Sequence, residues 1–304
     1  MKHAIKLIAT VIVMANIYSN EIQAQTKVPK EFPVFYKEGH RGGTGLMPEN
    51  TIPAMKNAVD VGANVIEVDV YTSKDGKVMI THDPQINWKI SLTPDGKELT
   101  EEEAKKYPVH QMNYDDVRKF DVGSKYYPPF PGQKKIKAFI PLLGELIDSV
   151  EQHTTASKLP KVIYNIELKT SPAFDSVYNS RPEELVDAVM KIVNSKKIGD
   201  RFYIQSFDKR PLQYVRKKYP RVTIGFLLSN TESFDENIKQ LGFVPHIYSP
   251  AFKLVTPELV QQCKASQCKL VVWTVNTKDD MTRLKDMGVD GIITDYPNYL
   301  SELK

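Results

Sequence analysis

Two carboxylates, Glu67 and Asp69, alternate with apolar residues in a predicted β-strand, on a face that is expected to be buried. In the stretch VIEVDV, residues 65–70, apolar side chains alternate with Glu67 and Asp69. Successive side chains of a strand point to opposite faces, so the two carboxylates share one face and the apolar residues share the other. Burying two unpaired carboxylates is costly. The cost is removed if they lie at an open edge of the sheet and bind a cation.

A second stretch, YNIELK at residues 164–169, repeats the pattern with Asn165, Glu167 and Lys169 on one face. An exposed edge strand would explain one such stretch. Two of them, in a repeat whose sheet faces are normally both covered, favour a site. Ligation by oxygen alone selects Mg²⁺ or Ca²⁺ over zinc or copper. Lys169 is then expected to offset the charge of a bound anion.

Two histidines end predicted strands beside these carboxylates, His40 and His82. A histidine at a strand end is more often structural than catalytic. Next to a carboxylate cluster it suits acid or base catalysis, because its charge changes near neutral pH. Arg41 follows His40 directly and is by its chemistry a bidentate phosphate ligand, with a surface ion pair as the plain alternative.

The glycines after His40 do not form a P-loop. The stretch KEGHRGGTGLMPENT, residues 37–51, lacks the Gly-Lys-Ser/Thr ending of that motif. Its three central glycines are instead expected to let the chain turn sharply off the first strand. Such a turn would leave His40 and Arg41 facing a bound phosphate.

The elements that must position these residues alternate between strand and helix. The predicted strands span 35–40, 65–71, 77–82, 161–169, 202–207, 222–228, 246–249, 270–275 and 291–294, and the predicted helices span 51–61, 182–196, 211–218, 233–240, 257–268 and 278–287. About eight strand–helix repeats over this length are typical of an α/β (β/α)₈ TIM barrel, ~250 residues long. A doubly wound open sheet is the second candidate.

Residues 87–160 interrupt this alternation with a Pro- and Tyr-rich text. A loop of this length in a compact domain is usually functional or has a small fold of its own. We therefore expect a small insertion after the second strand unit, capping one end of a barrel that spans residues 30–304. Its lysine cluster at 134, 135 and 137 is expected to be a solvated face rather than a ligand site.

Composition predicts a folded chain. Of 304 residues, 41% are hydrophobic and 26% are charged. The net charge of +4 is too small, and too evenly mixed in sign, to indicate a nucleic-acid partner. Cys263 and Cys268 are expected on different sides of one helix, so neither a disulfide nor a metal site is predicted there.

The N-terminus is typical of a secretory signal peptide. A short basic region at 1–6 precedes an apolar run at 7–17 and a polar stretch at 19–25. We expect cleavage after residues 1–24 and a periplasmic or secreted protein with no stable membrane span. The apolar run is short for a transmembrane helix, and an uncleaved anchor is the alternative.

Ordered motifs at the predicted strand ends resemble those of the glycerophosphodiester phosphodiesterase family. They are HRG at 40–42, PENT at 48–51, EVD at 67–69, THD at 81–83, NIELK at 165–169, WTVN at 273–276 and TDYP at 294–297. The resemblance extends from about Phe35 to Leu300. The stretch before His40 is more polar than the apolar first strand usual in the family. Glu38 lies on the His40 face by alternation, so it either supports that site or marks a bulge.

This resemblance implies a TIM barrel that holds one divalent cation, Ca²⁺ or Mg²⁺, and hydrolyses glycerophosphodiesters to glycerol 3-phosphate and an alcohol. The residues that match the family's motifs are the metal ligands Glu67, Asp69 and Glu167, the acid/base pair His40 and His82, the phosphate neighbours Arg41 and Lys169, the substrate wall Trp273, and the supporting residues Glu49 and Asn50. A packed core position is the alternative for Trp273.

Two other functions remain compatible with the same residues. One is cleavage that gives a cyclic phosphate, as in related phospholipases on this barrel. The other is a non-catalytic exported protein that binds phosphodiesters, against which the two histidines argue because binding alone needs no acid/base pair. In each case the partner is a small phosphodiester. The preferred head group, the metal and the oligomeric state stay open at this point.

Overall fold

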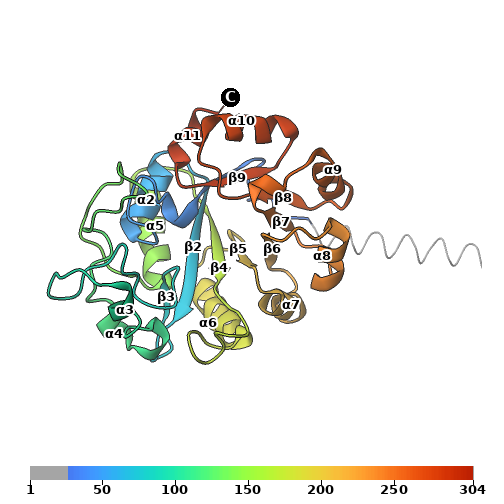
Figure 1. The fold of residues 1–304 in the computed structure, drawn as a ribbon. Coiled ribbons are helices and arrows are strands. Elements are labelled where there is room, and N and C mark those ends of the chain that lie inside the picture. Colours follow the sequence, from blue (N-terminus) through green and yellow to red (C-terminus); the bar gives the residue numbers. More distant parts are fainter. Residues whose placement is uncertain (1–26, 304) are drawn as a thin grey trace, which may run out of the picture.

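The computed structural model describes residues 27–303, and the predicted signal peptide, residues 1–24, lies outside them. Eight parallel strands form a closed barrel with helices around it (Figure 1). Its strands are β1 (Tyr36–Gly39), β2 (Val65–Thr72), β4 (Ile163–Leu168), β5 (Phe202–Ser206), β6 (Thr223–Leu228), β7 (Ile247–Pro250), β8 (Lys269–Val272) and β9 (Gly291–Thr294). Among the described residues, no helix is long and apolar enough to span a membrane.

The pairing of β1 with both β9 and β2 closes the sheet, so the predicted TIM barrel is confirmed and the open sheet is excluded. The remaining strand, β3 (Val78–Ile80), runs antiparallel to β2 and lies outside the barrel. Below, the mouth means the end of the barrel where the parallel strands finish. Active sites of this fold occur at that end.

Seven helices surround the strands, and a short one ends the chain. They are α2 (Ile52–Asp60), α5 (Leu143–Ala156), α6 (Pro182–Ser195), α7 (Lys209–Lys218), α8 (Phe234–Leu241), α9 (Pro257–Ala265), α10 (Lys278–Met287) and α11 (Pro297–Ser301). Helix starts follow local capping chemistry: the Thr51 hydroxyl accepts the Ala54 N–H at 3.3 Å, and α2 has a proline in its first turn.

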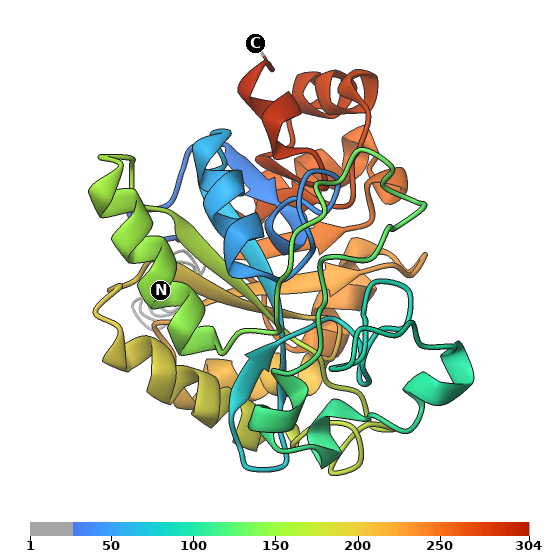
Figure 2. The ribbon, with the colours of Figure 1, turned by 90° about the vertical axis from the view of Figure 1, so that its left-hand side faces the viewer.

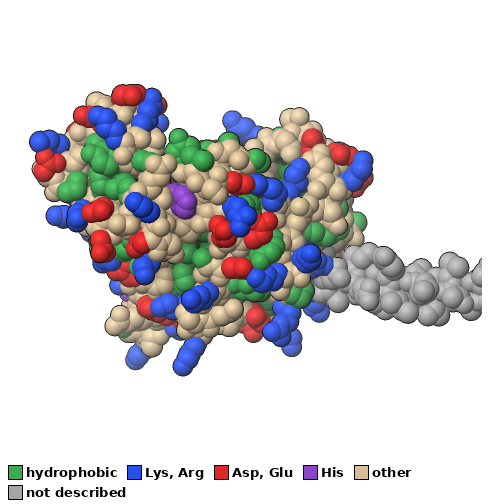
Figure 3. Space-filling view, turned by 90° about the horizontal axis from the view of Figure 1, so that it is seen from below, with side chains coloured by type: hydrophobic (Ala, Val, Ile, Leu, Met, Phe, Trp, Pro, Cys, Tyr) green, Lys and Arg blue, Asp and Glu red, His purple; other side chains and the backbone are tan. Residues whose placement is uncertain are grey.

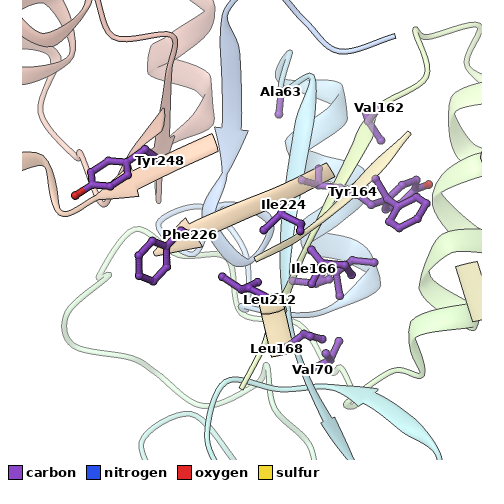
Figure 4. Packing of buried hydrophobic residues seen from close by; sticks show 14 of the residues in the cluster. Ala63, Val70, Val162, Tyr164, Ile166, Leu168, Leu212, Ile224, Phe226 and Tyr248 are labelled. Carbon is purple, nitrogen blue, oxygen red and sulfur yellow. The ribbon is translucent and has the colours of Figure 1, made fainter. Parts of the chain in front are cut away.

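Two hydrophobic layers hold the barrel. Outward-facing strand residues such as Val70, Ile166 and Leu168 pack against the helices (Figure 4). Inside the barrel, an apolar plug includes Phe32, and its other members are Tyr36, Val65, Ile163, Tyr203, Ile247, Val271 and Ile293. Truncating one such buried side chain to alanine typically costs ~2–5 kcal/mol, so both layers fix the strands that carry the mouth residues.

The predicted insertion, about 87–160, includes residues that form helix α5. Leu143, Leu146 and Ile147 of α5 are fully buried in the core between the strands and helices, so α5 is a barrel helix. The irregular segment of the insertion joins β3 to α5 (Figure 2). It packs around a separate hydrophobic cluster. It contains the helices α3 (Glu101–Ala104) and α4 (Tyr114–Val117) and the 3₁₀ turn η2 (Val109–Gln111).

The insertion is tied to the first loop at the mouth. The Gln133 side-chain amide donates to the backbone oxygens of Thr44 at 2.6 Å and Met47 at 3.2 Å. Its own apolar core includes Val109, Tyr114 and Val117. This segment therefore covers one side of the mouth as an ordered cap.

The two cysteines do not share a helix, which corrects the prediction for them. Helix α9 ends at Ala265, and the chain then turns back through Gln267, whose φ is 56°. The Cys268 N–H donates to the Cys263 oxygen at 3.0 Å. Both thiols are free and buried. The turn explains the error, because a uniform helical spacing does not extend past Ala265.

His246 makes stability depend on pH. Its Nδ1 accepts the Ile224 N–H at 3.1 Å, and burial, aided by the charge of Arg216, lowers the pKa of the imidazole to about 4. The unfolded chain takes up this proton at the ordinary histidine pKa, so stability falls as pH drops from about 6.5 to about 4, by up to ~3 kcal/mol. We expect His246→Asn to flatten this decline in denaturant titrations. An unchanged slope would contradict this assignment.

Candidate active site

Three buried carboxylates meet at the mouth. Glu67 and Asp69 come from β2, Glu167 comes from β4, and the pairing of the two strands sets Asp69 opposite Glu167. One carboxylate oxygen from each residue lies within 4.8 Å of the other two. The parallel pairing thus brings together the three residues that the sequence predicts as metal ligands.

The charges of this triad are only partly balanced by its neighbours. Lys169 Nζ lies 2.7 Å from Glu167 Oε1 and 3.5 Å from Asp69 Oδ1. The Arg41 backbone N–H donates to Glu67 Oε2 at 2.6 Å, but Glu67 Oε1 is buried and has no hydrogen-bond partner. An unpartnered carboxylate oxygen beside two further carboxylates fits a divalent cation with oxygen ligands.

Electrostatics shifts the pKa values of Glu67 and Asp69 in opposite directions. Burial, together with the charges of Asp69 and Glu167, raises the pKa of Glu67 well above its usual range. Burial also acts upward on the pKa of Asp69, but the cations Lys169 and Arg41 and the nearby His82 outweigh it and hold that pKa well below its usual range. In the metal-free site, a negative charge is therefore less favourable on Glu67 than on Asp69.

The first loop positions Arg41 by an unusual backbone. Arg41 begins the turn after β1 with φ 51°, and Gly42 follows with φ 82°. A Cβ at Gly42 would come within 2.9 Å of the Ala54 Cβ, so the glycine also permits the close approach of α2. The predicted sharp turn is confirmed. The turn points the Arg41 backbone N–H at Glu67, while the Arg41 side chain extends toward Glu49.

Both predicted supporting residues lie against this arrangement. Glu49 Oε1 accepts from Arg41 Nη1 at 3.0 Å, and Arg41 Nε lies 3.4 Å from Asp69 Oδ2. Asn50 Nδ2 donates to Asp69 Oδ2 at 2.9 Å. Hydrogen bonds of this kind orient a metal-binding carboxylate. The guanidinium is thereby held between Glu49 and the triad, at the edge of the pocket.

Each of the two predicted histidines has a carboxylate on Nδ1. His40 Nδ1 lies 2.6 Å from Asp295 Oδ1, and His82 Nδ1 lies 3.2 Å from Asp83 Oδ1. With Nδ1 occupied in this way, Nε2 is the ring nitrogen that remains for a substrate. The carboxylates in turn accept side-chain amides, Asn276 Nδ2 on Asp295 at 2.6 Å and Asn87 Nδ2 on Asp83 at 2.7 Å.

These partners were not among the predicted site residues. Asp295 follows β9, and β9 pairs with β1 in register from Tyr36 to Gly39, so its last residues come level with His40. The TDYP motif at 294–297 contains Asp295 and was a signal for it. The alternation of side chains within one strand, however, does not reveal which residue of another strand lies beside it. Asp83 stands next to His82 in the sequence and was equally open to recognition.

Glu67 and Glu167 of the triad, together with both histidines, line a pocket of about 200 Å³ at the mouth. Opposite the charged residues, the rings of Phe207 and Trp273 meet edge to face with centroids 5.3 Å apart. Trp273 lines the pocket while its Nε1 donates to the Ser249 oxygen at 2.8 Å. The Gln205 side chain forms part of the lining, and Phe207 was missed because its strand carries no charged residue.

Figure 3 views the molecule from below, the side toward which β2 runs in Figure 1. A histidine is visible on this face, with acidic and basic side chains around it. In the contacts above, every carboxylate of the site has a basic or amide neighbour. Such a pocket can hold an anion next to a cation-binding triad and exchange protons with it.

Comparison with known proteins identifies the family. The profile of the glycerophosphoryl diester phosphodiesterase family matches residues 40–299. The chain is 31% identical over 266 residues to glycerophosphodiester phosphodiesterase of Caldanaerobacter subterraneus subsp. tengcongensis, covering 87% of this chain and 95% of the relative.

Solved structures agree. A protein of Silicibacter pomeroyi DSS-3 assigned as a glycerophosphoryl diester phosphodiesterase superposes with a TM-score of 0.77 at 30% identity, covering 88% of this chain and 92% of that one. An Oleispira antarctica phosphodiesterase, solved with its product sn-glycerol-3-phosphate, shares the fold at 22% identity and a TM-score of 0.68, covering 87% of this chain and 94% of that one. The chain therefore belongs to the glycerophosphoryl diester phosphodiesterase family of enzymes.

Proposed function

We propose that this enzyme hydrolyses glycerophosphodiesters to glycerol 3-phosphate and an alcohol, with Ca²⁺ or Mg²⁺ held by Glu67, Asp69 and Glu167. The observation that carries the proposal is the unpartnered, buried Glu67 Oε1 facing two more carboxylates, beside two histidines that are each oriented by an acid. A cation bound there supplies Lewis-acid activation of a phosphate oxygen and orients a substrate hydroxyl.

The cationic side chains bind and stabilise the phosphate. Lys169 lies at the pocket wall, and the charges of Glu167 and Asp69 outweigh burial and raise the pKa of its ammonium, so it stays charged. Arg41 lines the same pocket and is fixed by Glu49. Positive groups held in place before the reaction stabilise the negative charge that develops at phosphorus.

His40 and His82 move the protons. The Asp295 and Asp83 carboxylates hold Nδ1 of each ring, so each Nε2 can accept or donate a proton in the pocket. One histidine takes the proton of the attacking oxygen, and the other protonates the leaving alcohol. The aromatic wall of Phe207 and Trp273 provides an apolar surface for the substrate's carbon skeleton.

A direct assay tests the proposal. Glycerophosphocholine and glycerophosphoethanolamine are each incubated with metal-stripped enzyme, with added Ca²⁺ or Mg²⁺, and with excess chelator. We expect phosphorus NMR to show glycerol 3-phosphate in the metal-loaded samples and loss of at least about 100-fold of the rate in chelator. Full activity in chelator would overturn the metal assignment.

Two other outcomes of this assay would contradict the proposal and support a different function. A cyclic phosphodiester as the final product would assign intramolecular attack by the substrate's own hydroxyl. Saturable binding without turnover, at saturating Ca²⁺ and Mg²⁺, would assign a binding protein. The two oriented histidines argue against the binding protein, because binding alone needs no acid/base pair. Both kinds of cleavage need such a pair, so the product seen by phosphorus NMR decides between them.

A further inference from the structure

A polar layer lies inside the barrel directly beneath the residues of the mouth. Glu38 of β1 and Asn165 of β4 stand two positions before His40 and Glu167, and Tyr203 of β5 is paired with Asn165. Because alternate residues of a strand share a face, these three side chains point into the barrel one step below the active site.

Glu38 joins this layer together. The Asn165 amide donates to its Oε1 at 2.5 Å, and the Tyr203 hydroxyl donates to its Oε2 at 2.8 Å. The Glu38 side chain has no exposed surface, and none of the described residues forms an ion pair with it. Beneath it the barrel is filled by the apolar plug that includes Phe32.

Burying a carboxylic acid without a cationic partner inside a barrel costs free energy. An apolar side chain at this place would avoid the desolvation of the carboxylate. Burial raises the pKa of Glu38 to about 7, although the hydrogen bonds from Asn165 and Tyr203 act in the opposite direction. The group therefore changes its charge near neutral pH instead of staying neutral throughout.

Few groups that titrate or carry charge face Glu38. Its own strand presents Tyr36, β5 presents Tyr203 and β2 presents Glu67, while β4 presents the amide Asn165. The Tyr203 hydroxyl has its pKa raised by burial first and then by the charges of Glu38, Tyr36 and Glu67. One hydroxyl thus lies within electrostatic reach of both Glu38 and the metal-binding triad.

We propose that Glu38 is a positioning residue of the cation site that supplies a fourth negative charge beneath the triad and so tightens the binding of a divalent cation. The proposal rests on the metal site proposed above. A charge in the water-poor barrel is weakly screened, so it acts on a cation that it does not touch. By linkage, the cation favours ionised Glu38, and affinity rises as pH increases through about 7.

The test variant is Glu38→Gln, which removes the charge and keeps the shape. The network can accept it, because Asn165 Oδ1 is buried without a partner and can take the new amide N–H if the Asn165 amide rotates. The remaining glutamine oxygen can still accept from Tyr203. The matched control is Tyr36→Phe, which changes the same interior but removes a hydroxyl that has no hydrogen-bond partner.

Calorimetric titration of the metal-free proteins with Ca²⁺ measures the effect. At about pH 8 we expect Glu38→Gln to bind about tenfold more weakly than the wild type, which corresponds to a fall of about one unit in the Glu38 pKa on binding. At about pH 6, where Glu38 is mostly protonated in the metal-free protein and about half protonated in the complex, the two affinities should agree within about twofold. Tyr36→Phe should match the wild type at both pH values.

Each other outcome overturns the inference. Equal affinities at the higher pH, or an equal loss at both pH values, would make Glu38 a structural residue only. If Glu38→Gln does not fold, Tyr203→Phe takes its place. That variant removes one donor from the carboxylate and should shift the affinity step to higher pH. Absence of Ca²⁺ and Mg²⁺ binding by the wild type would instead reject the metal site itself.

Discussion

Replacing Glu67 with glutamine is expected to abolish hydrolysis and, at the same time, to make the metal-free protein more stable. The substitution removes one of three ligands and should lower kcat/KM by at least about 1,000-fold. It also removes a buried carboxylate that repels Asp69 and Glu167. Relief of that repulsion is expected to raise the Tm of the metal-free protein by a few degrees, about 2–4 °C per kcal/mol gained.

The pH dependence gives this prediction a second signature. Because the pKa of Glu67 is raised in the folded state, the folded protein holds more protons than the unfolded chain above the ordinary glutamate pKa. Metal-free stability therefore falls as pH rises through that range. Thermal melts over pH should show a flatter profile for Glu67→Gln than for the wild type.

The matched control is Glu145→Gln on α5, whose carboxylate pairs with Arg118 on a partly exposed surface. It should change neither the rate nor the stability gained on adding Ca²⁺. A Glu67→Gln enzyme that keeps its rate, or that is still stabilised by Ca²⁺ as the wild type is, would remove Glu67 from the ligand set.

Replacing His40 with glutamine should lower kcat by about 100- to 10,000-fold while Ca²⁺ binding persists. His40 contacts Asp295 and not the triad, so the affinity for the cation should remain within about twofold of wild type. The reason for the loss is that a glutamine cannot take up and release a proton near neutral pH. Single-turnover rates and calorimetric titration separate the two quantities.

Two variants frame the His40 result. His82→Gln should show the same division between lost rate and kept affinity. His153→Gln, in which the lost imidazole pairs with Asp60 on the helices outside the barrel, should behave as the wild type. An unchanged kcat in His40→Gln would show that this residue has no proton to transfer.

The sequence predicts the triad well because its signal is local. Glu67 and Asp69 interrupt an apolar strand at a spacing of two, and Glu167 repeats this in a second strand. Parallel pairing then needs only the register that sets Asp69 beside Glu167 to complete the cluster. Where a site is made by alternation within strands that are already recognised, its position follows from the fold class.

The rest depends on contacts between segments far apart in the chain. Asp295 reaches His40 across 255 positions, and the Asn165–Glu38 hydrogen bond spans 127. The alternation at Glu38 was recognised, but its partners were not, because the lumen of a closed barrel joins strands that do not pair. Helix α5 was not predicted for a similar reason, since it follows a long irregular stretch and only its packing on the barrel distinguishes it.

Arg41 serves the site through two chemically separate parts. Its main-chain N–H holds Glu67, whereas its side chain contacts Glu49 and Asp69 and lines the pocket. Any residue except proline has that N–H. A substitution at position 41 that tolerates the backbone turn therefore keeps the hydrogen bond to the Glu67 carboxylate and changes only the side chain that faces a bound anion. The backbone contact that holds a metal-binding carboxylate therefore does not depend on the side chain at position 41. Substrate preference can change by substitution there while the metal-binding residues stay the same.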